Sequence, residues 1–173
     1  MSCIFTCNEL ILVVDNNVLI DLYELGRLDI LFMVSTKVII PRYIYEEEVQ
    51  IEIKELIKNN NYILEDITRE EGLYLFNKLT NDTKFKKLSI GDRIAISIAH
   101  ENIYFCTSND GLVRKACATY NVKISGTLGI IGRAYLKGYI DKPTAIQLSR
   151  DLESTSCFMK KTLIDDFISD KLQ

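Results

Sequence analysis

Short apolar segments alternate with segments of helical periodicity along most of this chain, and this alternation limits its fold more than any other feature. Leu10 to Val14 is a continuous apolar run that ends at Asp15, as expected of a strand buried on both faces. From Asn16 the apolar residues recur at helical spacing until Gly26. Further strands are expected at 37–40, 62–67, 103–107 and 122–124. Strands separated by helices predict an α/β domain, in which a central parallel sheet is flanked by helices in three layers.

The expected helices fill the intervals between these strands, and after Gly138 helices alone follow. They cover 16–25, 43–58, 70–79, 89–100, 112–119, 128–136, 142–152 and 160–172, with helical or irregular structure at 29–34. The polar, basic segment 80–88 is expected to be a loop or a fraying helix end. We therefore expect one core over residues 1–140, and a C-terminal helical pair over 141–173 that packs on the same domain.

Composition narrows the class of protein. The 173 residues include 21 basic and 24 acidic side chains, a net charge of −3, so nucleic acid cannot be bound through bulk charge. The longest apolar runs have five residues, too short for a bilayer, and no signal peptide is recognisable. Five cysteines without a CxxC pair disfavour zinc and disulfides, and Cys106 and Cys117 are expected in the core. Together these features favour a cytoplasmic protein.

A single histidine restricts the available catalytic chemistry. A Ser-His-Asp or Cys-His site would have to use His100, and a metalloprotease HExxH site is impossible. His100 lies near the end of an expected helix, where a solvent-facing cation suits the helix dipole. Histidine chemistry is therefore set aside.

Four acidic residues occur where active sites of parallel α/β sheets form. Asp15 ends the first expected strand and Asp110 follows the fourth, whereas Glu47 and Asp92 lie near the starts of helices. Carboxylates that converge in one crevice repel one another, and a divalent cation is the usual remedy. The pattern therefore predicts an acidic site at the carboxyl edge of the sheet.

Each acid also has a purely structural alternative. Asp15 could cap the following helix, although the asparagines after it could do so instead. Ser89 and Asp92 have the spacing of a capping box, which has about even odds with function. Glu47 stands among other glutamates, as on a solvated face, and Asp110 could be a turn or N-cap residue. Their order along the chain carries more information than any one of them.

In this order the motifs resemble those of the PIN-domain family of metal-dependent nucleases, particularly VapC-type toxins of toxin–antitoxin pairs. Asp15-Asn16-Asn17 resembles the opening motif, an Asp followed two residues later by Asn, Ser or Thr. Segments 40–47 and 91–99 resemble the second and third motifs, with their acids on Glu47 and Asp92. Segments 107–114 and 126–129 resemble the fourth motif and the junction downstream of it. The resemblance covers nearly the whole chain, including the terminal helices.

The resemblance implies an RNA endonuclease that uses one or two Mg²⁺ or Mn²⁺ ions, which suits a site of oxygen donors. Asp15 and Asp92 are then the principal ligands, and Glu47 and Asp110 complete the site directly or through water. The residues expected to orient ligands or touch phosphate are Asn17, Thr107 and Ser108.

One position departs from the pattern. Related sequences often carry two adjacent acids after the fourth strand, where this chain has Asn109-Asp110. We favour Asp110 as the fourth acid and keep Asn109 as its alternate. If the first position of the pair faces the metal, Asn109 supplies a neutral ligand and the site is weaker.

The resemblance further implies a cognate antitoxin that covers the acidic crevice, and a homodimer. The basic cluster Lys84-Phe85-Lys86-Lys87, with Arg93, Arg114 and Lys115, is a candidate for RNA binding. An ordinary solvated loop without RNA contact is the slightly favoured interpretation of the same segment.

Other classes of protein match the sequence less well. A receiver-like domain would need an acidic pair after the first strand, and this sequence does not supply one. A dinucleotide-binding enzyme would need GxGxxG after the first strand, whereas the glycines at 126, 129 and 132 come late and favour close helix packing. The serious rival is a catalytically weak PIN-like module that binds RNA or a protein without cutting, which Asn109 supports.

Overall fold

The fold was determined as a computed structural model that describes residues 9–156 and 159–172. The strands are β1 (Ile11–Val14), β2 (Lys37–Pro41), β3 (Tyr62–Glu65), β4 (Phe105–Thr107) and β5 (Lys123–Ser125). The helices are α1 (Asn16–Glu24), α2 (Leu28–Val34), α3 (Arg42–Glu47), α4 (Ile51–Ile57), α5 (Glu70–Asn81), α6 (Ile90–Asn102), α7 (Gly111–Thr119), α8 (Thr127–Leu136), α9 (Lys142–Asp151) and α10 (Lys161–Lys171). Two 3₁₀ turns are η1 (Thr83–Phe85) and η2 (Leu152–Ser154).

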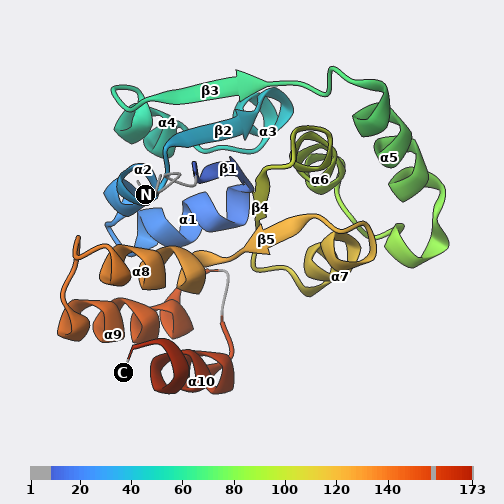
Figure 1. The fold of residues 1–173 in the computed structure, drawn as a ribbon. Coiled ribbons are helices and arrows are strands. Elements are labelled where there is room, and N and C mark those ends of the chain that lie inside the picture. Colours follow the sequence, from blue (N-terminus) through green and yellow to red (C-terminus); the bar gives the residue numbers. More distant parts are fainter. Residues whose placement is uncertain (1–8, 157–158, 173) are drawn as a thin grey trace, which may run out of the picture.

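All five strands are parallel and lie in the order β3-β2-β1-β4-β5 (Figure 1). The chain builds outward from β1 through β2 to β3, and then returns to β4 on the other side of β1. The strand order therefore reverses between β1 and β4, and ligand crevices of open α/β sheets form at such a point. Val14 pairs with Thr107 in this register, so Asp15 and Ser108 follow at neighbouring positions.

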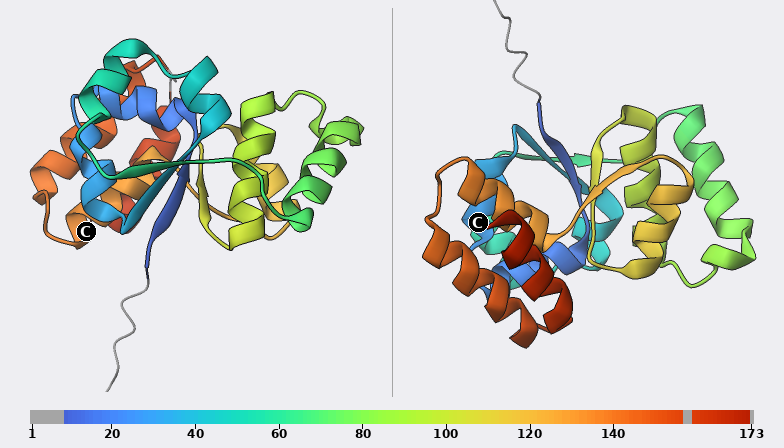
Figure 2. Two further views of the ribbon diagram at one scale, coloured as in Figure 1. Left: turned by 90° about the horizontal axis from the view of Figure 1, so that it is seen from above. Right: turned by 60° about the horizontal axis from the view of Figure 1, so that its bottom comes forward.

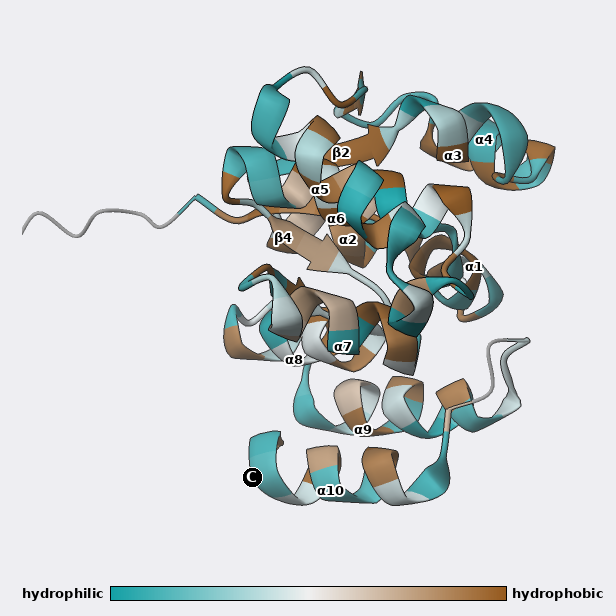
Figure 3. Ribbon diagram, turned by 90° about the vertical axis from the view of Figure 1, so that its right-hand side faces the viewer, coloured by the Kyte–Doolittle hydropathy of each residue, from teal (hydrophilic) through white to brown (hydrophobic). Residues whose placement is uncertain are grey.

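Helices cover both faces of the sheet, which confirms the predicted three-layer α/β fold. The views in Figure 2 show α1, α2 and α8 on one face, and α6 and α7 on the other with α5 outside α6. Strand residues such as Leu12, Val13, Ile39 and Cys106 are completely buried, which explains the continuous apolar runs. In Figure 3 strands β2 and β4 accordingly appear as hydrophobic segments between helices with hydrophilic outer residues.

The terminal helices α9 and α10 form an extra layer on α8 (Figures 1 and 3). A Cβ atom at Gly132 of α8 would lie 3.0 Å from Cζ of Phe167 in α10, which confirms close helix packing at this glycine. The residues before α10 also reach α1, because Thr155 Oγ1 donates to Asp21 Oδ1 over 2.8 Å. A domain boundary near residue 140 stays a prediction.

The single helix predicted over 43–58 is wrong, because the chain breaks between α3 and α4. Ile44 and Val49 are both buried but are five residues apart, a spacing that one continuous helix face does not provide. The backbone N–H of Val49 donates to the Ile44 carbonyl over 3.0 Å, and Gln50 is extended. The break lets both apolar side chains reach the core, and it moves Glu48 out of regular helix.

The structure places two of the five cysteines in the core. Cys106 and Cys117 are buried free thiols in the core, as predicted. Cys3, Cys7 and Cys157 lie outside the described residues. None of the helices in the described ranges is both long enough and apolar enough to cross a membrane.

Candidate active site

Asp15 stands at the carboxyl end of β1, beside the end of β4. Its side chain is only 4% exposed, and Ser108 Oγ donates a hydrogen bond to Asp15 Oδ2 over 2.9 Å. The Asp15 backbone N–H donates to Thr107 Oγ1 over 3.3 Å, and Asn17 Nδ2 donates to the same Oδ2 over 3.4 Å. Asp15 occupies the N-cap position of α1, but its side chain makes no capping hydrogen bond. The capping alternative therefore does not account for this carboxylate.

Burial and neighbouring charge act together on Asp15. Burial is the largest cause that raises its pKa from 3.8 to about 7, and the nearby carboxylates of Asp92 and Glu48 raise it further. The hydrogen bond from Ser108 opposes this shift because it stabilises the ionised form. A buried carboxylate that titrates near neutrality among other acids is typical of a functional site.

Asp92 combines the structural and the electrostatic roles that the sequence left open. It forms the predicted capping box with Ser89, whose N–H donates to Asp92 Oδ2 over 2.7 Å and whose Oγ accepts from the Asp92 N–H over 3.0 Å. Burial raises the pKa of Asp92, and the charge of Asp110 raises it as well, whereas the Ser89 hydrogen bonds and Arg93 lower it. The capping box thus holds Asp92 beside the other acids.

The structure brings Glu48 to this cluster, and not the predicted Glu47. Burial and the charge of Asp92 raise the pKa of the half-buried Glu48. A Cβ atom at Gly91 would collide with the Glu48 carboxylate, so the glycine leaves the space in which that carboxylate lies. Glu47 is exposed at the end of α3. The available signal was the spacing of four residues between buried Ile44 and Glu48, although Glu47 also follows Ile44 at helical spacing.

Asp110 lies at the exposed end of the cluster. It is the N-cap of α7, where its Oδ1 accepts from the backbone N–H groups of Leu112 over 2.6 Å and Val113 over 3.0 Å. Its own N–H donates to Ser108 Oγ over 3.1 Å. The sequence alternative of an N-cap is therefore realised, and Asp110 remains close enough to Asp92 to raise the pKa of that residue.

Asn109, the alternate for the fourth acid, points into a separate polar network. Its Nδ2 donates to Asp21 Oδ2 over 2.5 Å and to Thr127 Oγ1 over 2.8 Å, and its Oδ1 accepts from the Thr127 N–H over 3.0 Å. Thr127 Oγ1 also donates to Asp21 Oδ2 over 2.8 Å. Asn109 therefore serves the buried carboxylate of Asp21, a residue that the sequence analysis did not single out.

The chemistry of the donors fits a hard divalent cation, although the donors are not drawn together. Asp15, Glu48, Asp92 and Asp110 supply only oxygen, and none forms an ion pair with a Lys or Arg of the described chain. Within residues 9–156 and 159–172, no three His, Cys, Asp or Glu side chains stand close enough to hold one ion. A hollow of about 320 Å³ opens at Asp110, lined also by Asn17, Asn109, Gly111 and Ser156.

The aromatic residue of the basic segment is not available to stack on bases. Phe85 is 1% exposed and packs against Tyr120, with ring centroids 6.1 Å apart. The lysines at 84, 86 and 87 are exposed around it. The segment therefore presents solvated lysines, and its phenylalanine belongs to the core.

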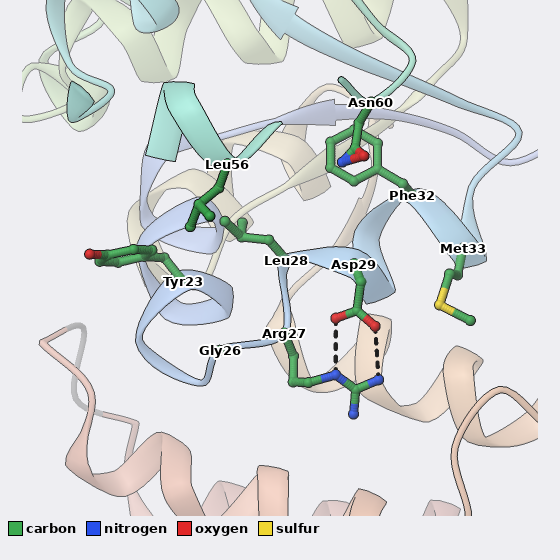
Figure 4. Close-up of a pocket in the computed structure, with 9 residues that line it drawn as sticks. All are labelled: Tyr23, Gly26, Arg27, Leu28, Asp29, Phe32, Met33, Leu56 and Asn60. Carbon is green, nitrogen blue, oxygen red and sulfur yellow. Dashed lines mark hydrogen bonds and ion pairs between the residues drawn. The ribbon is translucent and has the colours of Figure 1, made fainter. Parts of the chain in front are cut away.

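A larger hollow of about 870 Å³ lies elsewhere, over α1, α2 and α4 (Figure 4). Tyr23, Phe32, Met33 and Leu56 give it an apolar lining. Its acid, Asp29, is held in a bidentate pair by Arg27, with N–O distances of 2.9 and 3.0 Å. None of the clustered carboxylates lines this hollow.

Comparison with known proteins agrees with the fold. A sequence model of the PIN domain matches residues 11–171, which includes the terminal helices α9 and α10. No curated protein matches the chain. PIN domains are generally nucleases, and they typically use Mg²⁺ or Mn²⁺. Because this model covers more than half of the chain, and the five-stranded parallel sheet is consistent with such a fold, the chain belongs to the PIN-domain family.

Proposed function

We propose that this protein is a metal-dependent endoribonuclease that hydrolyses RNA phosphodiester bonds. One observation carries the proposal: three of the clustered acids use one carboxylate oxygen for structure and keep the other. In the described part of the chain, the side-chain hydrogen bonds end on Oδ2 of Asp15, Oδ2 of Asp92 and Oδ1 of Asp110. We assign the second oxygen of each to a ligand, and Glu48 adds a further carboxylate.

The proposed ligands are Asp15 and Asp92, completed by Asp110 and Glu48. Glu48 takes the role expected for Glu47, because it is the glutamate that lies against Gly91 and Asp92. When bound, Mg²⁺ or Mn²⁺ supplies the positive charge that acidifies water and stabilises the transition state at phosphorus. Because no three of these side chains stand close enough in the described residues to hold one ion directly, we propose that water completes part of the coordination.

The surrounding side chains act by holding Asp15 in place. Ser108 Oγ and Asn17 Nδ2 both donate to Asp15 Oδ2, and Thr107 Oγ1 accepts from its backbone N–H. These contacts fix the orientation of the Asp15 carboxylate toward a ligand. The hollow lined by Asn17, Asp110 and Ser156 is the space we assign to the scissile phosphate.

The test is cleavage of single-stranded RNA by the purified protein with Mn²⁺, with Mg²⁺ and with EDTA. Asp15→Asn should abolish a cleavage that EDTA also abolishes. Asp29→Asn is the matched control, because Asp29 is an exposed acid paired with Arg27 away from the site. Equal activity of the wild type and Asp15→Asn would contradict the proposal, and DNA in place of RNA tests the substrate class.

The rival function is an RNA-binding or protein-binding module that does not cut. It predicts that RNA is retained without cleavage in Mn²⁺, and that Asp15→Asn binds as well as the wild type. Asn109 gives this rival less support than the sequence suggested. Its amide donates to Asp21, so a structural role explains why this position is an asparagine and not an acid.

The toxin role, a cognate antitoxin and a homodimer complete the proposal. The apolar hollow of Figure 4 offers a protein partner a surface, since Leu56 is 60% exposed and Met33 40% exposed there. Light scattering of the purified chain tests the dimer. Arrest of cell growth on expression, relieved by Asp15→Asn, tests the toxin role.

A further inference from the structure

A second hollow, of about 500 Å³, lies at the edge of the sheet opposite to the carboxylates. It is lined by the first residues of three strands, Ile11 of β1, Phe105 of β4 and Lys123 of β5, whereas Asp15 and Asp110 come after the last residues of β1 and β4. Helix α8 contributes Arg133 and Leu136. The residues that line this hollow have no role in the proposed nuclease mechanism.

Two cations are held over one aromatic ring in this hollow. Lys123 Nζ lies 5.3 Å from the ring centroid of Phe105, and Arg133 Cζ lies 5.2 Å from it. Arg133 Nη1 also donates to Ser125 Oγ over 3.3 Å, and burial lowers the pKa of this half-buried guanidinium. In the part of the chain that is described, neither cation forms an ion pair with a carboxylate.

The remaining lining residues decide which kind of anion would fit. Lys137 adds a third cation, which donates to the Val34 carbonyl over 2.8 Å, and within residues 9–156 and 159–172 the lining contains a single acid, Glu9. The excess of positive charge favours an anion. Ile11 and Leu136 add apolar surface beside the charges, and Leu136 is 76% exposed. A ligand should therefore combine an anionic group with an apolar or planar body.

We propose that this hollow binds a nucleoside phosphate. Lys123 and Arg133, which both line the hollow, take the phosphate, because an ammonium and a guanidinium each bind phosphate oxygens well. The base lies on the apolar surface around Leu136. A volume of about 500 Å³ is within the range of small-molecule sites and exceeds what a lone phosphate needs. A fatty acid matches less well, because its single negative charge would leave one of the two cations uncompensated.

The same chemistry is offered by a free mononucleotide and by the phosphorylated end of an RNA chain. The proposal does not depend on cleavage, and its test is made in EDTA. Calorimetric titration with AMP should show binding, whereas adenosine and inorganic phosphate should each bind at least about tenfold more weakly. A 5′-phosphorylated trinucleotide and its unphosphorylated form then distinguish a chain end from a free nucleotide.

The variants locate the site. Lys123→Gln should weaken AMP binding about tenfold or more, and because Lys123 is exposed this change should leave the fold intact. Arg133→Gln should do the same, and an unchanged melting temperature shows that it still folds. The matched control Lys84→Gln removes an exposed lysine from the basic segment and should bind AMP normally.

Three results would overturn the proposal. They are the absence of AMP binding at millimolar concentration, binding that Lys123→Gln leaves unchanged, and binding that Asp15→Asn abolishes. The last result would place the nucleotide at the acidic cluster. Loss of RNA cleavage in the nuclease assay, with AMP binding intact, would count against the proposed function alone.

Discussion

Ser108 Oγ donates a hydrogen bond to Asp15 Oδ2 over 2.9 Å, and so joins the ends of β1 and β4 across 93 residues of sequence. Ser108 Oγ also accepts a hydrogen bond from the Asp110 N–H over 3.1 Å. One buried hydroxyl therefore links two of the proposed ligands, at the point where the strand order reverses. This bond makes the geometry of the acidic cluster depend on a residue that carries no charge.

Replacement of Ser108 by alanine should reduce cleavage by about one to two orders of magnitude. Ser108 lowers the pKa of Asp15, so its removal should move the alkaline rise of the pH–rate profile to higher pH. Single-turnover cleavage measured between pH 6 and pH 9 checks both effects.

Ser97→Ala is the matched control for this change. Ser97 is also completely buried, but its hydroxyl has no hydrogen-bond partner in the described structure. We expect unchanged cleavage and equal or higher stability, because no hydrogen bond is lost. Equal activity of the Ser108→Ala variant and this control would remove Ser108 from the site.

The metal-free protein should become less stable as pH rises from about 4 to about 7. The pKa of Asp15 is about 7 in the folded protein against 3.8 as its ordinary value, so the folded state binds more protons than the unfolded state in this interval. The free energy of unfolding therefore falls with rising pH. Asp15→Asn should be more stable than the wild type at pH 8, by at most about 4 kcal/mol, and similar to it at pH 4.

Urea unfolding in EDTA at the two pH values measures this difference. Addition of Mn²⁺ at pH 8 should then stabilise the wild type and not Asp15→Asn, because a cation that binds the folded state favours the ionised carboxylate. A wild type whose stability rises between pH 4 and pH 8 relative to Asp15→Asn would show that the carboxylate is stabilised in its ionised form, contrary to the structure.

Glu48→Gln and Glu47→Gln form a pair of neighbouring, chemically identical changes. Glu48→Gln should lower cleavage about tenfold or more at low Mn²⁺ concentration, with partial recovery at high Mn²⁺, because one anionic donor is lost. Glu47→Gln should leave cleavage unchanged, since Glu47 is exposed at the end of α3. The Mn²⁺ dependence of the initial rate measures both variants, and the reverse order of effects would restore the original assignment to Glu47.

Asn109→Asp should destabilise the protein, although it creates the adjacent acidic pair that related sequences often carry. The amide Nδ2 of Asn109 donates to Asp21 Oδ2, and an aspartate there would bring a second carboxylate against a side chain that is 1% exposed. A loss of about 2–4 kcal/mol is expected at pH 8, from the lost hydrogen bond and the repulsion together. The loss should be smaller at pH 5, where the new carboxyl can take up a proton, and thermal unfolding at both pH values checks this.

Sequence reasoning worked best where a local pattern decides the structure. The continuous apolar runs predict the buried strands, and the spacing of Ser89 and Asp92 predicts a capping box that the structure contains. The helix over 43–58 was wrong for a related reason, because short-range periodicity does not register a spacing of five between buried residues such as Ile44 and Val49. The confirmed capping box and the wrong helix were both inferred from residues close together in the sequence.

The sequence by itself determined the parallel α/β fold, the family, and the position of Asp15 after the first strand, since these depend on periodicity and on motifs of adjacent residues. The tertiary structure alone decided that Glu48 lies at the cluster and Glu47 does not, and that Asn109 turns to Asp21. It alone decided that burial raises the pKa of Asp15. The physical reason is that burial, charge repulsion and side-chain hydrogen bonds act between residues far apart in the chain, and only the folded packing sets which of them meet.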